Sequence, residues 1–263
     1  MKSRIVFFAF LIVFFLNGFS QVVVTNGLAH DFTASQGSVL KGEIILYNSE
    51  KSIENIRVYQ SDYAFYADGT SIYPEPGTLE RSNALWIDFS PAYATILPET
   101  DFTINYTVHV PSTKDASLTG TYWSVIMVEP VVNKNETVSE NSANIVTIVR
   151  YAIQIVVNID DTGEKKIQIL NGQFVKKNDG YVLELDIKNE GERGLRPTLK
   201  VELYDNTGNF IRDFIGDCFR LYPETSARFK ADLGALSKGD YFLLALIDND
   251  DIVWGSRYTV SVK

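Results

Sequence analysis

The chain has 263 residues, of which 45% are hydrophobic and 13% aromatic, so it holds enough apolar material for two folded domains. Its formal net charge of −9 at pH 7 argues against nucleic acid and anionic membrane surfaces as partners, since both attract basic proteins. The single cysteine, Cys218, excludes an intramolecular disulfide, and its apolar neighbours predict a buried, unreactive thiol.

The N-terminus has the pattern of an export signal. Lys2 and Arg4 precede an unbroken apolar run over residues 5–16, and small residues follow at positions 18 and 20. This pattern predicts a secretory signal peptide, residues 1–20, cut after Ser20. The run is shorter than the ~20 residues of a membrane-spanning helix, and no later segment predicts a span. Removal of the signal lowers the net charge to −11. The mature chain is expected to be exported, either periplasmic or associated with the cell surface.

Three short patterns occur twice in the same order. They are alternating aliphatic residues closed by an asparagine, the tripeptide Pro-Glu-Thr, and Gly-x-Tyr before an apolar strand. The matching pairs are Asn48 and Asn189, Pro98 and Pro223, and Tyr122 and Tyr241. Such ordered repetition predicts two copies of one structural unit.

Both copies have the alternation of β-strands. The clearest runs are residues 39–47, 56–67, 102–110, 182–188 and 199–204. About seven short strands per unit predict an all-β protein with two tandem immunoglobulin-like β-sandwich domains. We place these domains at residues 21–159 and 164–263, with a short linker at 160–163 that implies a defined angle between them. The repeated Gly-x-Tyr predicts a tyrosine corner, in which the phenol bonds back to the chain.

The longest strand candidate, residues 145–159, offers the first candidate binding site. One face is apolar at almost every position. The alternate face carries Ile148 and Ala152 around Arg150 and is more apolar than a solvent-facing side normally is. A long polar connection, residues 131–144, precedes the strand. We expect either a partner-binding edge here, or a face covered by the second sheet or the other domain.

A second candidate lies in residues 73–87, which interrupt the strand rhythm. Arg81 and Asn83 form a polar cluster beside Trp86, and exposed tryptophan and arginine often anchor protein interfaces. The alternative is that Trp86 fills the first hydrophobic core.

Catalytic and metal-binding patterns are sparse. His30 and His109 are the only histidines, and no nucleophile elbow, phosphate loop or zinc spacing occurs. We predict a protein that is not an enzyme and needs no cofactor, although a pair of hydrolytic carboxylates stays open. The acidic segments 160–164 and 248–251 could bind calcium, but they fit structural turns better, and no metal site is predicted.

The first unit resembles the N-terminal domain of PapD-type periplasmic chaperones, and still more the peptidoglycan-binding domain of WxL-interacting surface proteins. The resemblance rests on residues 39–48, the turn at Pro98 and the segments 110–111 and 120–126. It implies an immunoglobulin-like fold and a cell-envelope or surface protein as partner, with peptidoglycan as a further ligand. Pilus chaperones also carry a basic pair, an Arg in the first strand and a Lys in the last. This chain has no Arg in residues 22–25, and its last strand has Arg150 without the Lys.

These observations favour a non-enzymatic exported binding or scaffold protein that engages cell-envelope or surface proteins. The alternative is a periplasmic assembly chaperone that donates the strand at 145–159 to an incomplete surface or fimbrial subunit.

Overall fold

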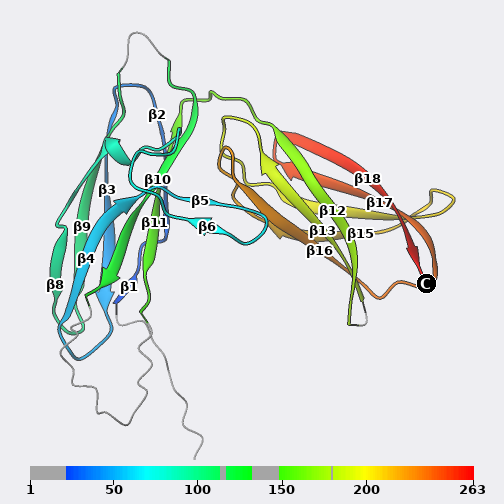
Figure 1. The fold of residues 1–263 in the computed structure, drawn as a ribbon, viewed down its shortest axis with the longest axis horizontal. Coiled ribbons are helices and arrows are strands. Elements are labelled where there is room, and N and C mark those ends of the chain that lie inside the picture. The colour runs from blue at the N-terminus through cyan, green and yellow to red at the C-terminus, as the bar shows by residue number, and fades with distance from the viewer. Residues whose placement is uncertain (1–21, 113–116, 132–147, 179) are drawn as a thin grey trace, which may run out of the picture.

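The computed structural model describes residues 22–112, 117–131, 148–178 and 180–263. Two β-sandwiches follow one another along the chain and meet at an elbow, as Figure 1 shows. The predicted signal peptide lies outside the described residues. Within the described ranges, no helix has the length and hydrophobicity that a membrane span requires. The prediction of an all-β, two-domain immunoglobulin-like protein is confirmed.

The first sandwich packs a four-stranded sheet, ordered β1-β3-β9-β7, against a five-stranded sheet, ordered β2-β11-β10-β4-β8. The chain changes sheets between β1 and β2, so β2 runs parallel to β11. The strands are β1 (Val22–Val24), β2 (Ala29–Ala34), β3 (Val39–Asn48), β4 (Glu54–Ser61), β7 (Ile87–Ser90), β8 (Tyr93–Ile96), β9 (Asp101–His109), β10 (Gly120–Pro130) and β11 (Tyr151–Ile159).

A small hairpin of β5 (Ala64–Phe65) and β6 (Ser71–Ile72) projects from the first sandwich toward the second (cyan in Figure 1). Asp68 and Gly69 form the turn at its tip, where Gly69 has a φ of 90°. A single turn of 3-10 helix, η1 (Ala84–Trp86), returns the chain to β7.

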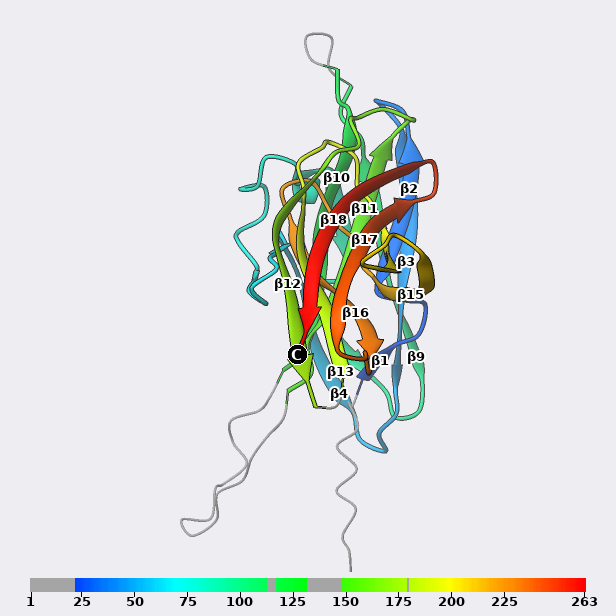
Figure 2. The ribbon, with the colours of Figure 1, turned by 90° about the vertical axis from the view of Figure 1, so that its right-hand side faces the viewer.

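The second sandwich packs the sheet β12-β13-β16 against the sheet β15-β14-β17-β18. Its strands are β12 (Ile167–Lys177), β13 (Gly180–Asn189), β14 (Thr198–Asp205), β15 (Phe210–Cys218), β16 (Ser226–Gly234), β17 (Gly239–Asn249) and β18 (Ile252–Val262). The strands β17 and β18 form the hairpin that ends the chain (orange-red and red in Figure 2). Residues 250–251 make its turn, as predicted.

Each sandwich has its own hydrophobic core, because alternate residues of every long strand point between its two sheets. In β11 the apolar face predicted from the sequence is buried at Ile153, Ile155 and Val157. A third, smaller cluster of Trp123, Val156 and Tyr222 lies between the two sandwiches.

Two local predictions have different outcomes. The tyrosine corner forms in the second sandwich, where the Tyr241 hydroxyl donates to the Ser237 carbonyl at 2.9 Å. The prediction of a buried Cys218 is wrong. This thiol is exposed at the end of the edge strand β15, with Sγ 3.7 Å from the Arg196 carbonyl oxygen. Most residues of β15 are exposed, because this edge strand contributes little to the second core.

Candidate functional site

The predicted binding strand β11 is only partly an edge. It begins at Tyr151; residues 148–150 are described but lie outside the strand, and residues 145–147 lie outside the described part of the chain. From Gln154 to Ile159 it lies between β10 and β2, which pairs with it in parallel. The expectation of a partner-binding edge along the whole strand is therefore wrong for this portion, because β2 already occupies it.

The beginning of β11 is open on the side of β2. The Gln154 amide donates to the Leu28 carbonyl at 2.9 Å, just before β2 begins. Backbone groups alternate between the two sides of a strand, so the amide and carbonyl of Ala152 point to this same side, beyond the start of β2. Among the described residues, no hydrogen bond joins them there. An open strand edge of this kind is a template for another chain.

Apolar side chains lie on both chain segments that border this opening. Ile148 is 53% exposed and Val149 is 36% exposed just before β11, and Leu28 is 47% exposed just before β2. Ala152 itself is half-buried opposite Met127 of β10. The start of β11 thus combines available backbone groups with exposed apolar side chains.

Arg150, predicted as part of this site, is tied to the strands behind it. Its Nε lies 3.2 Å from Oε2 of Glu129, and the Tyr59 hydroxyl donates to the same oxygen at 3.0 Å. Arg57 pairs with the other oxygen of this carboxylate at 2.5 Å, which raises the pKa of Arg57. These contacts anchor the start of β11 on the sheet without using its open edge.

The second predicted cluster lies elsewhere and does not join the first. Asn83 is fully buried and donates to the Ile155 carbonyl at 3.0 Å, while its own carbonyl accepts from Ser124 at 2.6 Å. Trp86 packs against the first core, with its ring 4.7 Å from that of Tyr122. Asn83 therefore has no surface for a partner in this structure, and Trp86 adopts the core position considered as the alternative.

Arg81 instead connects the two sandwiches. Its guanidinium donates to the Thr119 carbonyl at 2.8 Å, lies 3.1 Å from the Glu192 carboxylate, and sits 5.5 Å from the centre of the Tyr122 ring. Glu192 belongs to the second sandwich, so this contact is structural and bridges the elbow.

Sequence reasoning missed the residues that hold the two sandwiches together. Tyr222 is buried, its ring stacks on Trp123 with centroids 4.7 Å apart, and its hydroxyl bonds Gln154 at 2.5 Å. Burial raises the pKa of Tyr222. Arg220 forms a bidentate ion pair with Asp31 of β2, and this pair raises the pKa of Arg220. Tyr222 directly precedes the repeated Pro-Glu-Thr and Arg220 lies two residues before Tyr222, but the repeat gave no sign of their contacts.

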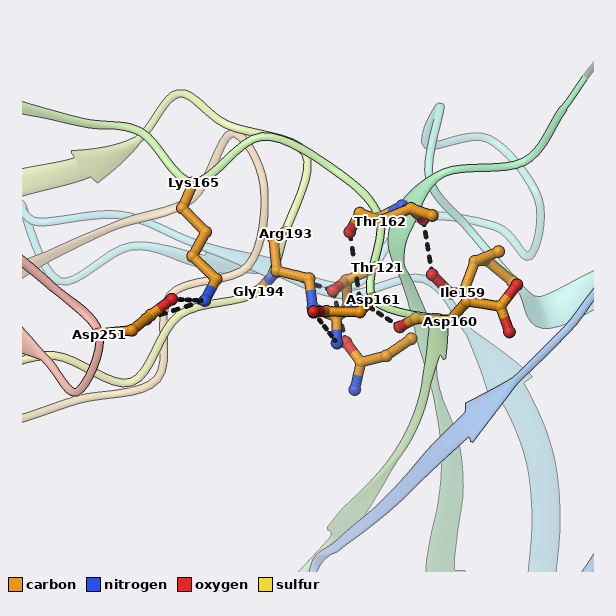
Figure 3. Close-up of polar contacts among 11 residues, drawn as sticks. Thr121, Ile159, Asp160, Asp161, Thr162, Lys165, Arg193, Gly194 and Asp251 are labelled. Carbon is orange, nitrogen blue, oxygen red and sulfur yellow. Dashed lines mark hydrogen bonds and ion pairs between the residues drawn. The ribbon is translucent and has the colours of Figure 1, made fainter.

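The backbone itself approaches closely at the elbow. Arg193 donates to the Asp160 carbonyl at 2.7 Å, and the Gly194 amide donates to the Thr121 hydroxyl at 2.7 Å (Figure 3). A Cβ on Gly163, which has a φ of 89°, would lie 2.5 Å from the Cα of Gly120. The linker is therefore packed, and only glycine fits at this point.

The predicted acidic turn at residues 248–251 has two lysine partners. Lys165 binds both carboxylate oxygens of Asp251, at 2.7 and 2.9 Å (Figure 3), and Lys200 lies 2.5 Å from Asp248. The bond from Lys165 lowers the pKa of Asp251, and the bond to Asp248 raises the pKa of Lys200. Across the described ranges, no three metal-binding side chains converge on one point.

His30 is a half-buried titratable group of the first sandwich. Its Nδ1 lies 2.7 Å from the Tyr106 hydroxyl, and its buried Nε2 has no hydrogen-bond partner among the described residues. Burial lowers the pKa of His30 and raises that of Tyr106. The other histidine, His109, is exposed at the end of β9 with Nε2 3.4 Å from Asp88. The two histidines do not form a shared site.

No protein-family model and no curated protein matches this chain. It is similar in fold to several solved structures. They include a chaperone–tip adhesin complex of CFA/I fimbriae biogenesis (12% identity, 92% of this chain and 100% of that chain, TM-score 0.48) and the class 5 fimbriae chaperone CfaA (12%, 92% and 99%, 0.46). Another is the periplasmic chaperone SfaE (9%, 92% and 100%, 0.39). These similarities are to chaperone structures and not to peptidoglycan-binding proteins, and they concern the fold alone.

Proposed function

We propose that this chain is an exported, non-enzymatic protein that binds an extended segment of a cell-envelope or surface protein at the start of β11. The observation that carries the proposal is the open edge at Ala152, whose amide and carbonyl have no partner among the described residues beside the start of β2. A partner strand there would gain backbone hydrogen bonds, and exposed Ile148 would supply apolar contact.

We further propose that the partner is an incomplete surface subunit and that the protein acts as its assembly chaperone. An incomplete sheet needs one more strand, and the open start of β11 offers backbone groups for it, with exposed Ile148 and Val149 directly before. A scaffold that binds a complete envelope protein through the same edge is the second candidate. The two differ in one measurable respect, because a chaperone keeps its isolated partner from aggregating, whereas a scaffold binds a partner that is soluble alone.

The backbone geometry allows a sharp test. Ala152→Pro removes an amide that points to the open side, so the pairing with β10 should survive while strand addition is blocked. We expect the variant to lose at least about tenfold in partner affinity, measured after partner capture from envelope extract. Ala152→Val, which keeps the amide, is the matched control and should bind normally.

A second variant, Ile148→Lys, tests the apolar contribution. It should keep the thermal midpoint of the wild type, because the side chain is exposed, yet weaken capture. Normal capture by both Ala152→Pro and Ile148→Lys, with the fold intact, would refute the proposed edge.

A further inference from the structure

A cavity at the elbow has a lining suited to a different ligand. It has a volume of about 350 Å³ and lies between the β5–β6 hairpin, at Ala64 and Tyr66, and residues 79–81, 190–192 and 223–225. Trp123, Ala64 and Thr225 are almost fully buried and close its inner end, whereas Tyr66 is 39% exposed at its rim. The cavity lies beside Trp123 at the start of β10, whereas the open edge of β11 lies opposite Met127 and Val128 near the other end of β10.

The lining of the cavity carries more negative than positive side chains. Four carboxylates and one guanidinium line the cavity. The guanidinium of Arg81 is already held by Thr119 and Glu192. The remaining carboxylates are Glu190, paired with Lys166, Glu224, paired with Lys188, and Glu80, which is exposed.

Glu80 is the carboxylate still available to a ligand. No hydrogen bond or ion pair joins its side chain to the described residues. It lies next to Leu79 in the chain, and the exposed ring of Tyr66 lines the same cavity. Apolar walls with one available carboxylate and an aromatic ring match a side chain that has a long apolar stem and a cationic head.

We propose that this elbow cavity binds a lysine or arginine side chain of a partner protein. The methylene groups would pack against Leu79 and Tyr66, and the cationic head would pair with Glu80. An anionic side chain is disfavoured by the excess of carboxylates, and an apolar side chain would leave Glu80 without a partner. The acidic mature chain also attracts basic segments over longer distances. The inference goes beyond the strand-binding function, because it uses a separate surface.

The test uses the full mature protein and two capped pentapeptides, Gly-Gly-Lys-Gly-Gly and its analogue with norleucine in place of lysine. Binding is followed through the indole N–H signal of Trp123 in nuclear magnetic resonance spectra. Trp123 lines the cavity, whereas Trp86 and Trp254 pack against the two domain cores. We expect the lysine peptide to bind at least about tenfold more tightly than the norleucine peptide. Added salt should reduce that difference.

Glu80→Gln should abolish the preference for lysine. Glu75→Gln is the matched control, since Glu75 is an exposed carboxylate of the same segment outside the cavity lining. Equal binding of the two peptides, or an unchanged lysine preference in Glu80→Gln, would overturn the proposal. Because Ala152→Pro leaves the cavity intact, failure of the strand-binding proposal would be visible separately.

Discussion

Both sandwiches contain a buried asparagine that bonds to the following turn, but they differ in the path of their first strand. In each, a buried asparagine ends the second strand of one sheet: Asn48 in β3 and Asn189 in β13. Asn48 donates to the Ser52 carbonyl at 2.8 Å and accepts from the Glu50 amide at 3.0 Å. Asn189 makes the equivalent bonds four and two residues further on, at 2.8 and 2.9 Å.

The repeated Pro-Glu-Thr also adopts one geometry twice. Glu99 and Glu224 have positive φ values of 54° and 62°. The carbonyls of Thr100 and Thr225 then accept from the amides of the two buried asparagines, at 3.1 and 3.0 Å. The repeated asparagine and Pro-Glu-Thr therefore mark the positions where a turn is hydrogen-bonded to the end of a core strand.

The difference lies in the first strand. In the first sandwich the chain leaves β1, changes sheets and covers most of β11 with β2. In the second sandwich, β12 stays beside β13, and among the described residues β18 has β17 as its only strand neighbour. The same core can therefore present either a long open edge or a short opening, depending on the path of one strand.

The largest expected effect comes from replacing the two buried asparagines. Asn48→Ala and Asn189→Ala each leave several buried carbonyl and amide groups without partners, so each should lower the free energy of unfolding by about 3 kcal/mol. Urea unfolding can be followed with Trp86 and Trp123 for the first half and Trp254 for the second. Asn105→Ala, at an exposed strand position, should change little. An unchanged free energy of unfolding in only one of the two variants would show that the two asparagines do not have equivalent roles.

A smaller effect should separate the halves. Tyr241→Phe removes the hydroxyl bond to Ser237 and should cost about 1 kcal/mol of unfolding free energy. Tyr122→Phe, at the matching position, should cost less than about 0.5 kcal/mol, because no hydrogen bond from its hydroxyl to the described residues is present. Equal losses in the same urea experiment would contradict a tyrosine corner confined to the second sandwich.

The smallest effect concerns pH, since both histidines lie in the first half. Burial lowers the pKa of His30 below its ordinary value of 6.5, so the unfolded chain binds this proton more readily than the folded one. The first half should therefore lose stability as the pH falls from about 7.5 to about 5, before most carboxylates titrate. His30→Phe should remove this dependence and His109→Gln should keep it. A pH response unchanged in His30→Phe would exclude His30 as its source.

Local patterns were sufficient to predict the fold class but not the strand neighbours. Alternation in β3, β9, β13 and β14 identified long strands, because one face of each is buried in a core. The short segment of β2 has no strong alternation, so its parallel pairing with β11 could not be predicted. That pairing depends on contacts far apart in sequence, and it decides where the edge of β11 is open.

Local sequence also did not indicate which residues of the candidate sites are covered by distant strands. The apolar residues around Ile148 drew attention to the start of β11, and a partner there stays a prediction. Asn83 was expected in a polar surface cluster, and Trp86 either beside it or in the first core; both are covered by other strands. Their burial comes from Ser124, Tyr122 and Ile155 of strands distant in the chain. Asp68-Gly69, in the hairpin of β5 and β6, has residue types typical of a turn. Nothing local indicates that the Ala67 amide donates to the Ser226 hydroxyl across the elbow.

The packed glycines of the elbow have a consequence for the thermodynamics of binding. At Gly120, where φ is 73°, a Cβ would lie 2.2 Å from the Glu192 carbonyl oxygen, and a Cβ on Gly163 would lie 2.5 Å from the Gly120 Cα. The relative orientation of the halves is thus fixed before any partner arrives. A ligand that touches both halves would lose no interdomain orientational entropy on binding, so more of its contact energy is available as affinity.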